Sequence, residues 1–132
     1  MKKLILVVLS TALSGCMVDN SPYRGAQISL AANGQPCVTV SKDSLTSEGK
    51  SKLLVLRVSA RFPDNNMQQV WVRDDMSNPM LTVQPGECLP IDYHFEKSKE
   101  YSVSAITAFS ASEVGTKRIW SVGFTLDDLA KK

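Results

Sequence analysis

The fold is decided by one stretch of the chain, Lys52-Leu53-Leu54-Val55-Leu56-Arg57-Val58-Ser59-Ala60-Arg61. Its side chains alternate: Leu54, Leu56, Val58 and Ala60 fall on one side, and Arg57, Ser59 and Arg61 fall on the other. A period of two residues is that of a β-strand with one buried face. The stretch therefore predicts a central strand over residues 52–61.

Further apolar runs of similar length lie on both sides of this strand and are separated by turn residues. They cover residues 26–32, 35–40, 68–73, 80–83, 87–91, 101–109 and 118–126. None of these windows shows the apolar stripe of a helix. We expect 101–109 and 118–126 to pair as neighbours. About seven to eight short strands at this spacing predict an all-β fold, a two-sheet antiparallel β-sandwich.

The dipeptide Asn33-Gly34 marks a hairpin between the runs 26–32 and 35–40. Asn-Gly suits a two-residue type I′ turn, whose central positions both need a positive φ. In the register that such a turn fixes, Cys37 faces Leu30. The sequence therefore predicts that Cys37 points inward, as a disulfide between two sheets would require.

The N-terminus has the pattern of a secretory leader. Lys2 and Lys3 precede the apolar run 4–9, and Leu13-Ser14-Gly15-Cys16 resembles the lipobox of bacterial lipoproteins. The apolar run is too short for a membrane span of about 20 residues. The resemblance implies that residues 1–15 are removed and that Cys16 carries a lipid. The alternative is an ordinary signal peptide.

The segment after the leader, residues 16–25, holds no periodic apolar pattern. We expect it to be the tether between the lipid and a single domain of residues 26–132. Met17 stands where inner-membrane lipoproteins often carry Asp, so the lipobox resemblance implies the outer membrane. The expected location is therefore the periplasm, with a lipid anchor in the membrane.

The charge balance changes when the leader is removed. The chain has 15 Lys and Arg residues against 13 Asp and Glu residues, and the leader takes Lys2 and Lys3 from the first group. The remainder is formally neutral and has no long basic run. This composition argues against nucleic acid as a partner and against electrostatic binding to anionic lipid.

Cysteine usage predicts a covalent staple. With Cys16 assigned to the lipid, Cys37 and Cys88 remain. An even pair of cysteines in an oxidising compartment predicts a disulfide. The alternative is two unpaired cysteines in the core.

Residues with catalytic or metal-binding chemistry form no recognisable motif. His94, the single histidine, lies close to Asp92, but no Gly-x-Ser-x-Gly elbow accompanies them. Ser47-Glu48-Gly49-Lys50 matches a Ser-x-x-Lys pattern without its companion motifs. The acidic turns 64–66 and 74–75 lack the spacing of a calcium loop, and no cysteine or histidine cluster has zinc spacing. We therefore expect no catalytic residue, metal, cofactor or small-molecule substrate.

A protein-binding surface is the remaining expectation. Strand alternation places Trp71 and Arg73 on one side, and Val70 and Val72 on the other. Trp and Arg are enriched in binding hot spots, so the Trp71 side and its flanking loops are the predicted surface. The predicted partner-binding residues are Trp71, Arg73, Asn65 and Asp75. The alternative is that Trp71 packs beneath the sandwich.

A set of short segments carries a further pattern. It consists of Tyr23-Arg24-Gly25 leading into Ile28-Ser29-Leu30, then Asn33-Gly34-Gln35-Pro36-Cys37, Gln84-Pro85-Gly86-Glu87-Cys88-Leu89-Pro90 and Tyr101-Ser102-Val103. Together with the leader, these segments resemble the type VI secretion immunity periplasmic lipoproteins of enteric bacteria. Residues 39–83 carry no motif of that family, and we expect partner specificity to vary there.

The resemblance implies a protein that binds and neutralises a toxic effector, commonly a phospholipase, delivered into the periplasm by a neighbouring cell. A lipid anchor would hold the inhibitor at the membrane where such a toxin acts. The competing interpretation is a structural or assembly lipoprotein of an envelope secretion or pilus apparatus. A third interpretation, a small hydrolase, would need catalytic groups that the sequence does not show.

Overall fold

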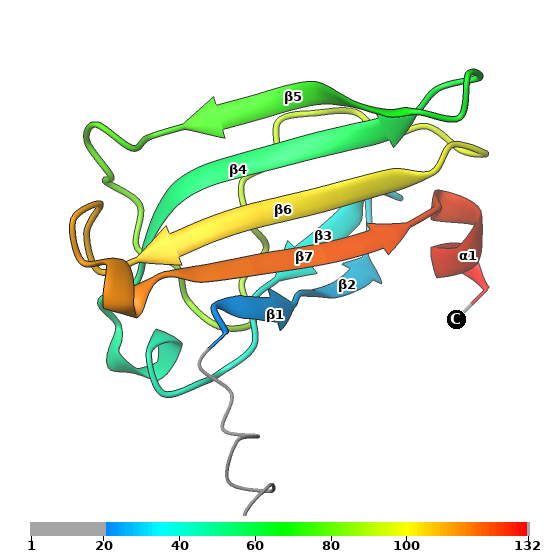
Figure 1. Ribbon diagram of the computed structural model, residues 1–132. Coiled ribbons are helices and arrows are strands. Elements are labelled where there is room, and N and C mark those ends of the chain that lie inside the picture. Colours follow the sequence, from blue (N-terminus) through cyan, green and yellow to red (C-terminus); the bar gives the residue numbers. More distant parts are fainter. Residues whose placement is uncertain (1–20, 132) are drawn as a thin grey trace, which may run out of the picture.

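Seven strands form two sheets in the computed structural model, which describes residues 21–131 (Figure 1). The strands are β1 (Tyr23–Gly25), β2 (Gln27–Leu30), β3 (Pro36–Thr39), β4 (Lys52–Arg61), β5 (Met67–Asp74), β6 (Tyr101–Ala108) and β7 (Arg118–Phe124). The larger sheet has the order β1-β7-β6-β4-β5, and β2 pairs with β3 in the smaller one. The predicted all-β sandwich is confirmed.

Most pairings in both sheets are antiparallel, as predicted. Hydrogen-bonded neighbours include β4 with β5, β4 with β6, and β6 with β7. The exception is β1, which runs parallel to β7 and pairs Tyr23 with Ile119. The sheet therefore begins within the segment expected to be the tether. The leader, residues 1–15, and Cys16 lie outside the described residues.

The core lies between the larger sheet and the layer behind it. The central strands supply its centre with Val58 of β4, Val103 of β6 and Trp120 of β7, all of them buried. The predicted alternation of β6 and β7 is confirmed, because Tyr101 pairs with Phe124 and Val103 with Val122 on the core side. One face of the larger sheet is therefore committed to the core.

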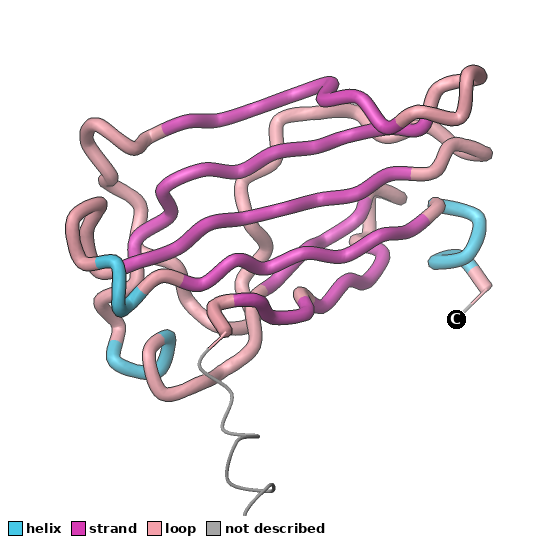
Figure 2. The backbone as a smooth tube through the Cα atoms, viewed as in Figure 1, coloured by secondary structure: helices cyan, strands magenta, loops and turns pink. Residues whose placement is uncertain are grey.

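The second layer contains the β2–β3 hairpin and an irregular segment that passes behind β4 (Figure 2). Runs 80–83 and 87–91 were predicted as strands, and this prediction is wrong. Thr82 forms an isolated bridge with Lys52, and Leu89 N–H donates to Val38 O at 2.8 Å. Pro90 has no N–H to continue a ladder. The segment nevertheless buries Val83, Leu89 and Phe95.

The hairpin register differs from the prediction by one residue. Ala31 N–H donates to Gln35 O, so the loop between these residues holds three residues rather than two. Gly34 has a φ of 82°, the left-handed conformation at the third position of such a loop. Cys37 consequently faces Ser29 instead of Leu30. The predicted type I′ turn and the inward-pointing Cys37 are wrong.

The predicted disulfide between Cys37 and Cys88 is present. Because the neighbouring Val38 points into the core with 1% of its surface exposed, Cys37 lies on the outside of the hairpin. The disulfide joins β3 to the irregular segment and so fixes the second layer over the sheet.

Two β-bulges change which side chains point inward. The β4–β5 register shifts between Val58 and Ser59, and Val70 and Trp71 on β5 consequently both pack against the main core. The alternation predicted for Val70 and Trp71 is therefore wrong. A second shift in β4 places Leu53 in the main core and Leu54 in a smaller cluster, so the predicted placement of Leu54 with Leu56, Val58 and Ala60 is wrong.

The C-terminal run was predicted to be a strand as far as residue 126, but the strand ends at Phe124. A short helix, α1 (Leu126–Ala130), follows. Its N-cap is Thr125, whose hydroxyl accepts from Asp128 N–H at 3.0 Å. Leu126 and Leu129 are buried and close one end of the core. The 3₁₀ turns η2 (Thr46–Glu48) and η3 (Val114–Thr116) lie in loops at the other end.

Candidate functional site

The larger sheet has a second face, which we call the outer face. Among the described residues no second sheet covers it, although Val55 and Ala108 at one end are buried in the smaller apolar cluster. Figure 1 looks onto this face, with the hairpin and the irregular segment behind it. The side chains on it alternate with those of the core: Tyr23 on β1, Ile119 and Ser121 on β7, Ser102, Ser104 and Ile106 on β6, Val55, Arg57 and Ser59 on β4, and Val72 on β5. This is the broadest candidate for a protein-binding surface.

An apolar row crosses the outer face near one end. The strand register places Val55 beside Ile106, Ile106 beside Ile119, and Ile119 beside Tyr23. Tyr23 is 66% exposed at the edge of the sheet, whereas Val55 is buried. A pocket of about 100 Å³ opens next to the row, with Ile106 and Val114 in its lining.

A polar row lies directly beside the apolar one. Arg57 stands between Val72 on β5 and Ser104 on β6, and Ser104 stands beside Ser121 on β7. Arg57 and Ser121 are exposed. The outer face thus combines an exposed tyrosine, a central arginine and small hydroxyl side chains, which allow close approach of a partner backbone.

The four predicted partner-binding residues do not form one surface. Trp71 is partly buried, pairs with Val58 and packs against the core, as the alternative interpretation stated. Arg73 lies on the same side and its Nε donates to Asp75 Oδ2 at 2.9 Å. Asn65 lies at the opposite end of the β4–β5 hairpin.

Asn65 has a structural reason to be where it is. Phe62 N–H donates to Asn66 O, so residues 63–65 form a three-residue loop like that of the other hairpin. Asn65 occupies its third position with a φ of 70°. Asn adopts this left-handed conformation more readily than most residues.

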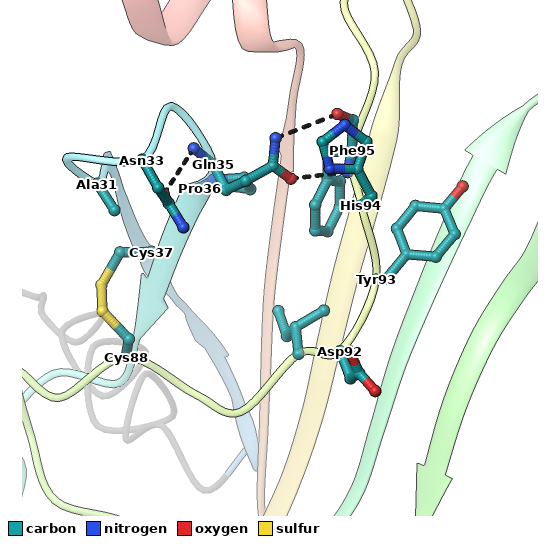
Figure 3. Close-up of a pocket in the computed structure, with 11 residues that line it drawn as sticks. Ala31, Asn33, Gln35, Pro36, Cys37, Cys88, Asp92, Tyr93, His94 and Phe95 are labelled. Atoms are coloured by element: carbon teal, nitrogen blue, oxygen red, sulfur yellow. Dashed lines mark hydrogen bonds between the residues drawn. A yellow bond between two sulfur atoms is a disulfide. The ribbon is translucent and has the colours of Figure 1, made fainter.

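The single histidine lies in a second candidate site, a depression of about 400 Å³ beside the disulfide (Figure 3). His94 and Asp92 are exposed there, and no serine or threonine is among the described residues that line it. The Gln35 side chain joins the β2–β3 hairpin to the segment that contains His94. Its amide Nε2 donates to Phe95 O, and its Oε1 accepts from Phe95 N–H at 2.8 Å. The site is thus a shallow surface depression whose wall is fixed by hydrogen bonds.

The aromatic residues behind this depression are tightly packed. Tyr93 and Phe95 lie edge to face with ring centroids 5.1 Å apart, and Phe95 and Tyr101 pack likewise at 4.8 Å. Burial and the neighbouring Tyr101 raise the pKa of Tyr93. The Tyr93 phenol therefore stays protonated at neutral pH and contributes packing rather than charge.

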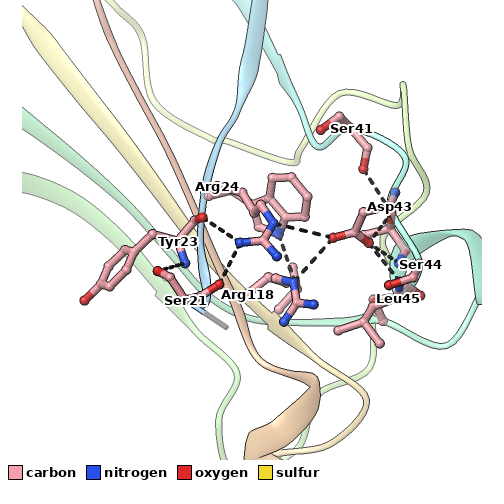
Figure 4. Close-up of polar contacts among 12 residues, drawn as sticks. Ser21, Tyr23, Arg24, Ser41, Asp43, Ser44, Leu45 and Arg118 are labelled. Atoms are coloured by element: carbon pink, nitrogen blue, oxygen red, sulfur yellow. Dashed lines mark hydrogen bonds and ion pairs between the residues drawn. The ribbon is translucent and has the colours of Figure 1, made fainter. Parts of the chain in front are cut away.

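A polar cluster ties three chain segments together at the end of the sandwich where β1 begins (Figure 4). Asp43 Oδ1 accepts from Leu45 N–H at 2.9 Å and from Thr46 N–H at 2.8 Å. Its Oδ2 lies 3.4 Å from Arg118 Nε and 4.0 Å from Arg24 Nε.

The environment of Asp43 favours its charged form. Partial burial would raise its pKa, but hydrogen bonds from Thr46 and Leu45 and the charge of Arg118 outweigh burial, and the pKa of Asp43 is lowered. The carboxylate caps the loop before β4 and joins it to β1 and β7. This arrangement explains the cluster as a structural staple.

The described residues, 21–131, hold neither a metal-binding cluster nor a membrane-spanning helix. Within them, no group of three or more His, Cys, Asp or Glu side chains could hold a metal ion. In the same range no helix has the length and apolar character to cross a membrane.

The comparison with known families matches residues 23–129 to one described as Domain of unknown function (DUF7480). The chain belongs to this family. The DUF7480 match runs from β1 through α1, so it takes in both sheets, the disulfide and the outer face. No match was found among curated proteins or among solved structures.

The outer face of this DUF7480 domain was not predicted from the sequence, in which Trp71 and Arg73 are the residue types typical of a binding hot spot. A signal was present on β6, where Ser102 and Ser104 alternate with the core residues Tyr101 and Val103. Small polar residues in that alternation mark the solvent side of a half-buried strand. Which strands adjoin, and hence the rows across the face, depends on pairings that the sequence does not specify.

Proposed function

We propose that this chain is a non-catalytic immunity protein of the periplasm, held at the membrane by a lipid on Cys16. Its function is to bind and neutralise a protein effector, commonly a phospholipase in such systems, that a competitor delivers by type VI secretion. The binding surface is the outer face of the five-stranded sheet. The observation that carries this proposal is that outer face.

The composition of the outer face supports a protein partner. Tyr and Arg are enriched in binding hot spots, and here Tyr23 and Arg57 stand on one surface with the apolar row between β1 and β4. The serines around Arg57 offer hydrogen bonds without steric bulk. Such a surface suits a folded protein better than a small ligand, which needs a concave site.

The rigidity of the fold supports tight binding. Backbone ladders join all five strands of the larger sheet, and the Cys37–Cys88 disulfide fixes the layer behind it. A preformed surface loses little conformational entropy when the complex forms. This low entropic cost favours the high affinity that an inhibitor needs for its target.

The short link to Cys16 supports action at a membrane. The sheet begins at Tyr23, and a chain of n residues spans at most about 3.6 Å times n, so the domain would stay within roughly 25 Å of a lipid on Cys16. Confinement at the surface raises the local concentration of the inhibitor where a phospholipase must act.

The test is protection of cells that express, in their periplasm, a type VI secretion effector whose gene adjoins the gene for this chain. The wild-type lipoprotein should restore growth, and Arg57→Glu should abolish protection while the protein still accumulates. Lys97→Glu is the matched control, because Lys97 is exposed in the loop before β6 and belongs to no strand of the larger sheet. Lack of protection by the wild-type protein would contradict the proposal. If a pull-down with the protein captured secretion-apparatus subunits, that result would favour the assembly role.

A further inference from the structure

Strand β5 forms a free edge of the larger sheet. Among the described residues it is hydrogen-bonded to β4 alone, and Figure 1 shows no element beyond it. It runs from Met67 to Asp74 and contains neither Pro nor Lys; its two charged residues, Arg73 and Asp74, lie at one end, and its bulge at Val70 lies in the middle. Met67 is 37% exposed and Val72 is 43% exposed. Such an edge is a template for another strand.

The hydrogen bonds to β4 show which backbone groups remain for a new strand. Asp75 N–H donates to Leu54 O, so Arg73 and Trp71 also direct their groups toward β4, and Val72 and Asp74 direct theirs outward.

The bulge at Val70 interrupts this alternation, and the pattern restarts on its other side. There, Phe62 N–H donates to Asn66 O, so Gln68 directs its groups toward β4. Met67 and Gln69 therefore direct theirs outward. The free edge thus carries outward backbone groups at Met67, Gln69, Val72 and Asp74.

The same bulge sets the side-chain faces. Val70 and Trp71 both pack against the core. Gln69 pairs with Ser59 on the outer face, whereas Gln68 pairs with Ala60 on the core side. From Val70 back to Met67, and from Trp71 on to Asp74, the side chains therefore point in the same order: core, outer face, core, outer face. The strand is symmetric about the point between Val70 and Trp71.

We propose that β5 pairs in antiparallel fashion with β5 of a second copy of this chain, about a two-fold axis between Val70 and Trp71. In this register Gln69 faces Val72 and Met67 faces Asp74, and all four direct their backbone groups to the partner. Gln68 faces Arg73 on the core side. A shift by one residue would place side chains of opposite faces together.

The side chains facing each other in this register are compatible. Arg73 meets the amide of Gln68, which can accept a hydrogen bond, and Asp74 meets Met67. No two like charges stand opposite one another, a condition that cross-strand pairs require for stability. The pairing doubles the five-stranded sheet and extends the outer face across both copies.

The interface is small. It uses eight residues from each copy, whereas stable interfaces use about 20–30 residues a side. The dimer is therefore reversible and is populated at high protein concentration or at a crowded membrane surface. Its detection needs a wide concentration range.

The test is sedimentation equilibrium of the chain from residue 16 with Cys16→Ser, from micromolar to millimolar concentration. This part retains every described strand, the described core and the disulfide. The wild type should show a monomer–dimer equilibrium. A monomer at every concentration would overturn the proposal and leave the edge to a foreign strand.

Charge substitutions at two positions test the register. Met67→Lys and Gln68→Glu place an opposite charge before Asp74 and Arg73, and each should strengthen the dimer roughly threefold to tenfold, since each pair occurs twice. Met67→Glu and Gln68→Lys place a like charge there and should weaken it by a similar factor. Charge effects that depend on the sign of the added charge alone, and not on position, would overturn the register.

A matched pair of control variants is available at Val114, which is 72% exposed in η3, the turn between β6 and β7, and is not part of β5. Val114→Lys and Val114→Glu should leave the dimerisation constant unchanged. These measurements need no effector. A monomeric result would therefore not contradict the proposed immunity function, and a lack of effector binding would not contradict the dimer.

Discussion

Trp120 on β7 and Thr107 on β6 are joined by a hydrogen bond inside the core. Trp120 Nε1 donates to Thr107 Oγ1 at 3.0 Å, and the two residues are 1% and 0% exposed. They are diagonal neighbours, since Trp120 pairs directly with Ala105. The indole N–H of the largest buried side chain is thereby satisfied, which lets a tryptophan occupy the centre of the sandwich.

Removing either partner should destabilise the domain. Trp120→Phe leaves the Thr107 hydroxyl without the indole, and Thr107→Val leaves the buried indole N–H without an acceptor. Each should lower the free energy of unfolding by about 1–3 kcal/mol, and loss of packing volume adds to the first. Urea unfolding measures both. The double variant should lose less than the sum, and strict additivity would show that the bond contributes nothing.

Removing the disulfide should destabilise the domain, because the unfolded chain would gain conformational entropy. Cys37 and Cys88 are separated by 51 positions, for which the chain-entropy model gives about 4 kcal/mol. The variant with both cysteines changed to alanine should unfold at lower urea concentration than the oxidised wild type. Adding reductant should shift the wild type to the same midpoint and leave the variant unaffected. Equal midpoints for oxidised wild type and variant would contradict this role.

Asp43 should make the stability depend on acid pH. Its pKa is lower in the folded protein than its value of about 3.9 in an unfolded chain, so the folded state favours the charged carboxylate. The stabilisation is complete above about pH 4 and is lost as pH falls through the folded pKa.

Two variants separate the contributions of Asp43. Asp43→Ala removes the hydrogen bonds from Leu45 and Thr46 as well as the ion pairs, and should cost about 1–2 kcal/mol at pH 7. Asp43→Asn can still accept the backbone hydrogen bonds and should cost less. The difference in stability between wild type and Asp43→Asn should shrink as pH falls below about 4. A difference that stays constant down to pH 2 would contradict the assignment.

The strands that could be predicted from the sequence are those that keep a period of two over most of their length. The bounds of β4 were predicted as observed, and the facing rows of β6 and β7 followed from Tyr101, Val103 and Trp120. These strands pack one face in the core and expose the other, so the pattern reports burial directly. The disulfide followed from the count of cysteines.

The features that the sequence did not predict depend on register shifts of one residue. One extra residue at Val70 turns Trp71 toward the core, and one extra residue in the hairpin loop turns Cys37 outward. Bulges and loop types of similar cost compete at such points, and tertiary packing decides between them. The helix α1 had a visible signal, since Thr125 followed by Asp127 and Asp128 is a capping pattern, but its five residues gave no helical period.

The outer face is the proposed effector-binding surface. The most direct measurement is the dissociation constant for the proposed effector, purified and titrated by calorimetry with wild type, Arg57→Glu and Lys97→Glu, each with the disulfide intact. Binding at the outer face predicts high affinity for wild type and Lys97→Glu and at least about a tenfold loss of affinity for Arg57→Glu, the size expected of a hot-spot residue. Equal affinities for all three proteins would contradict it.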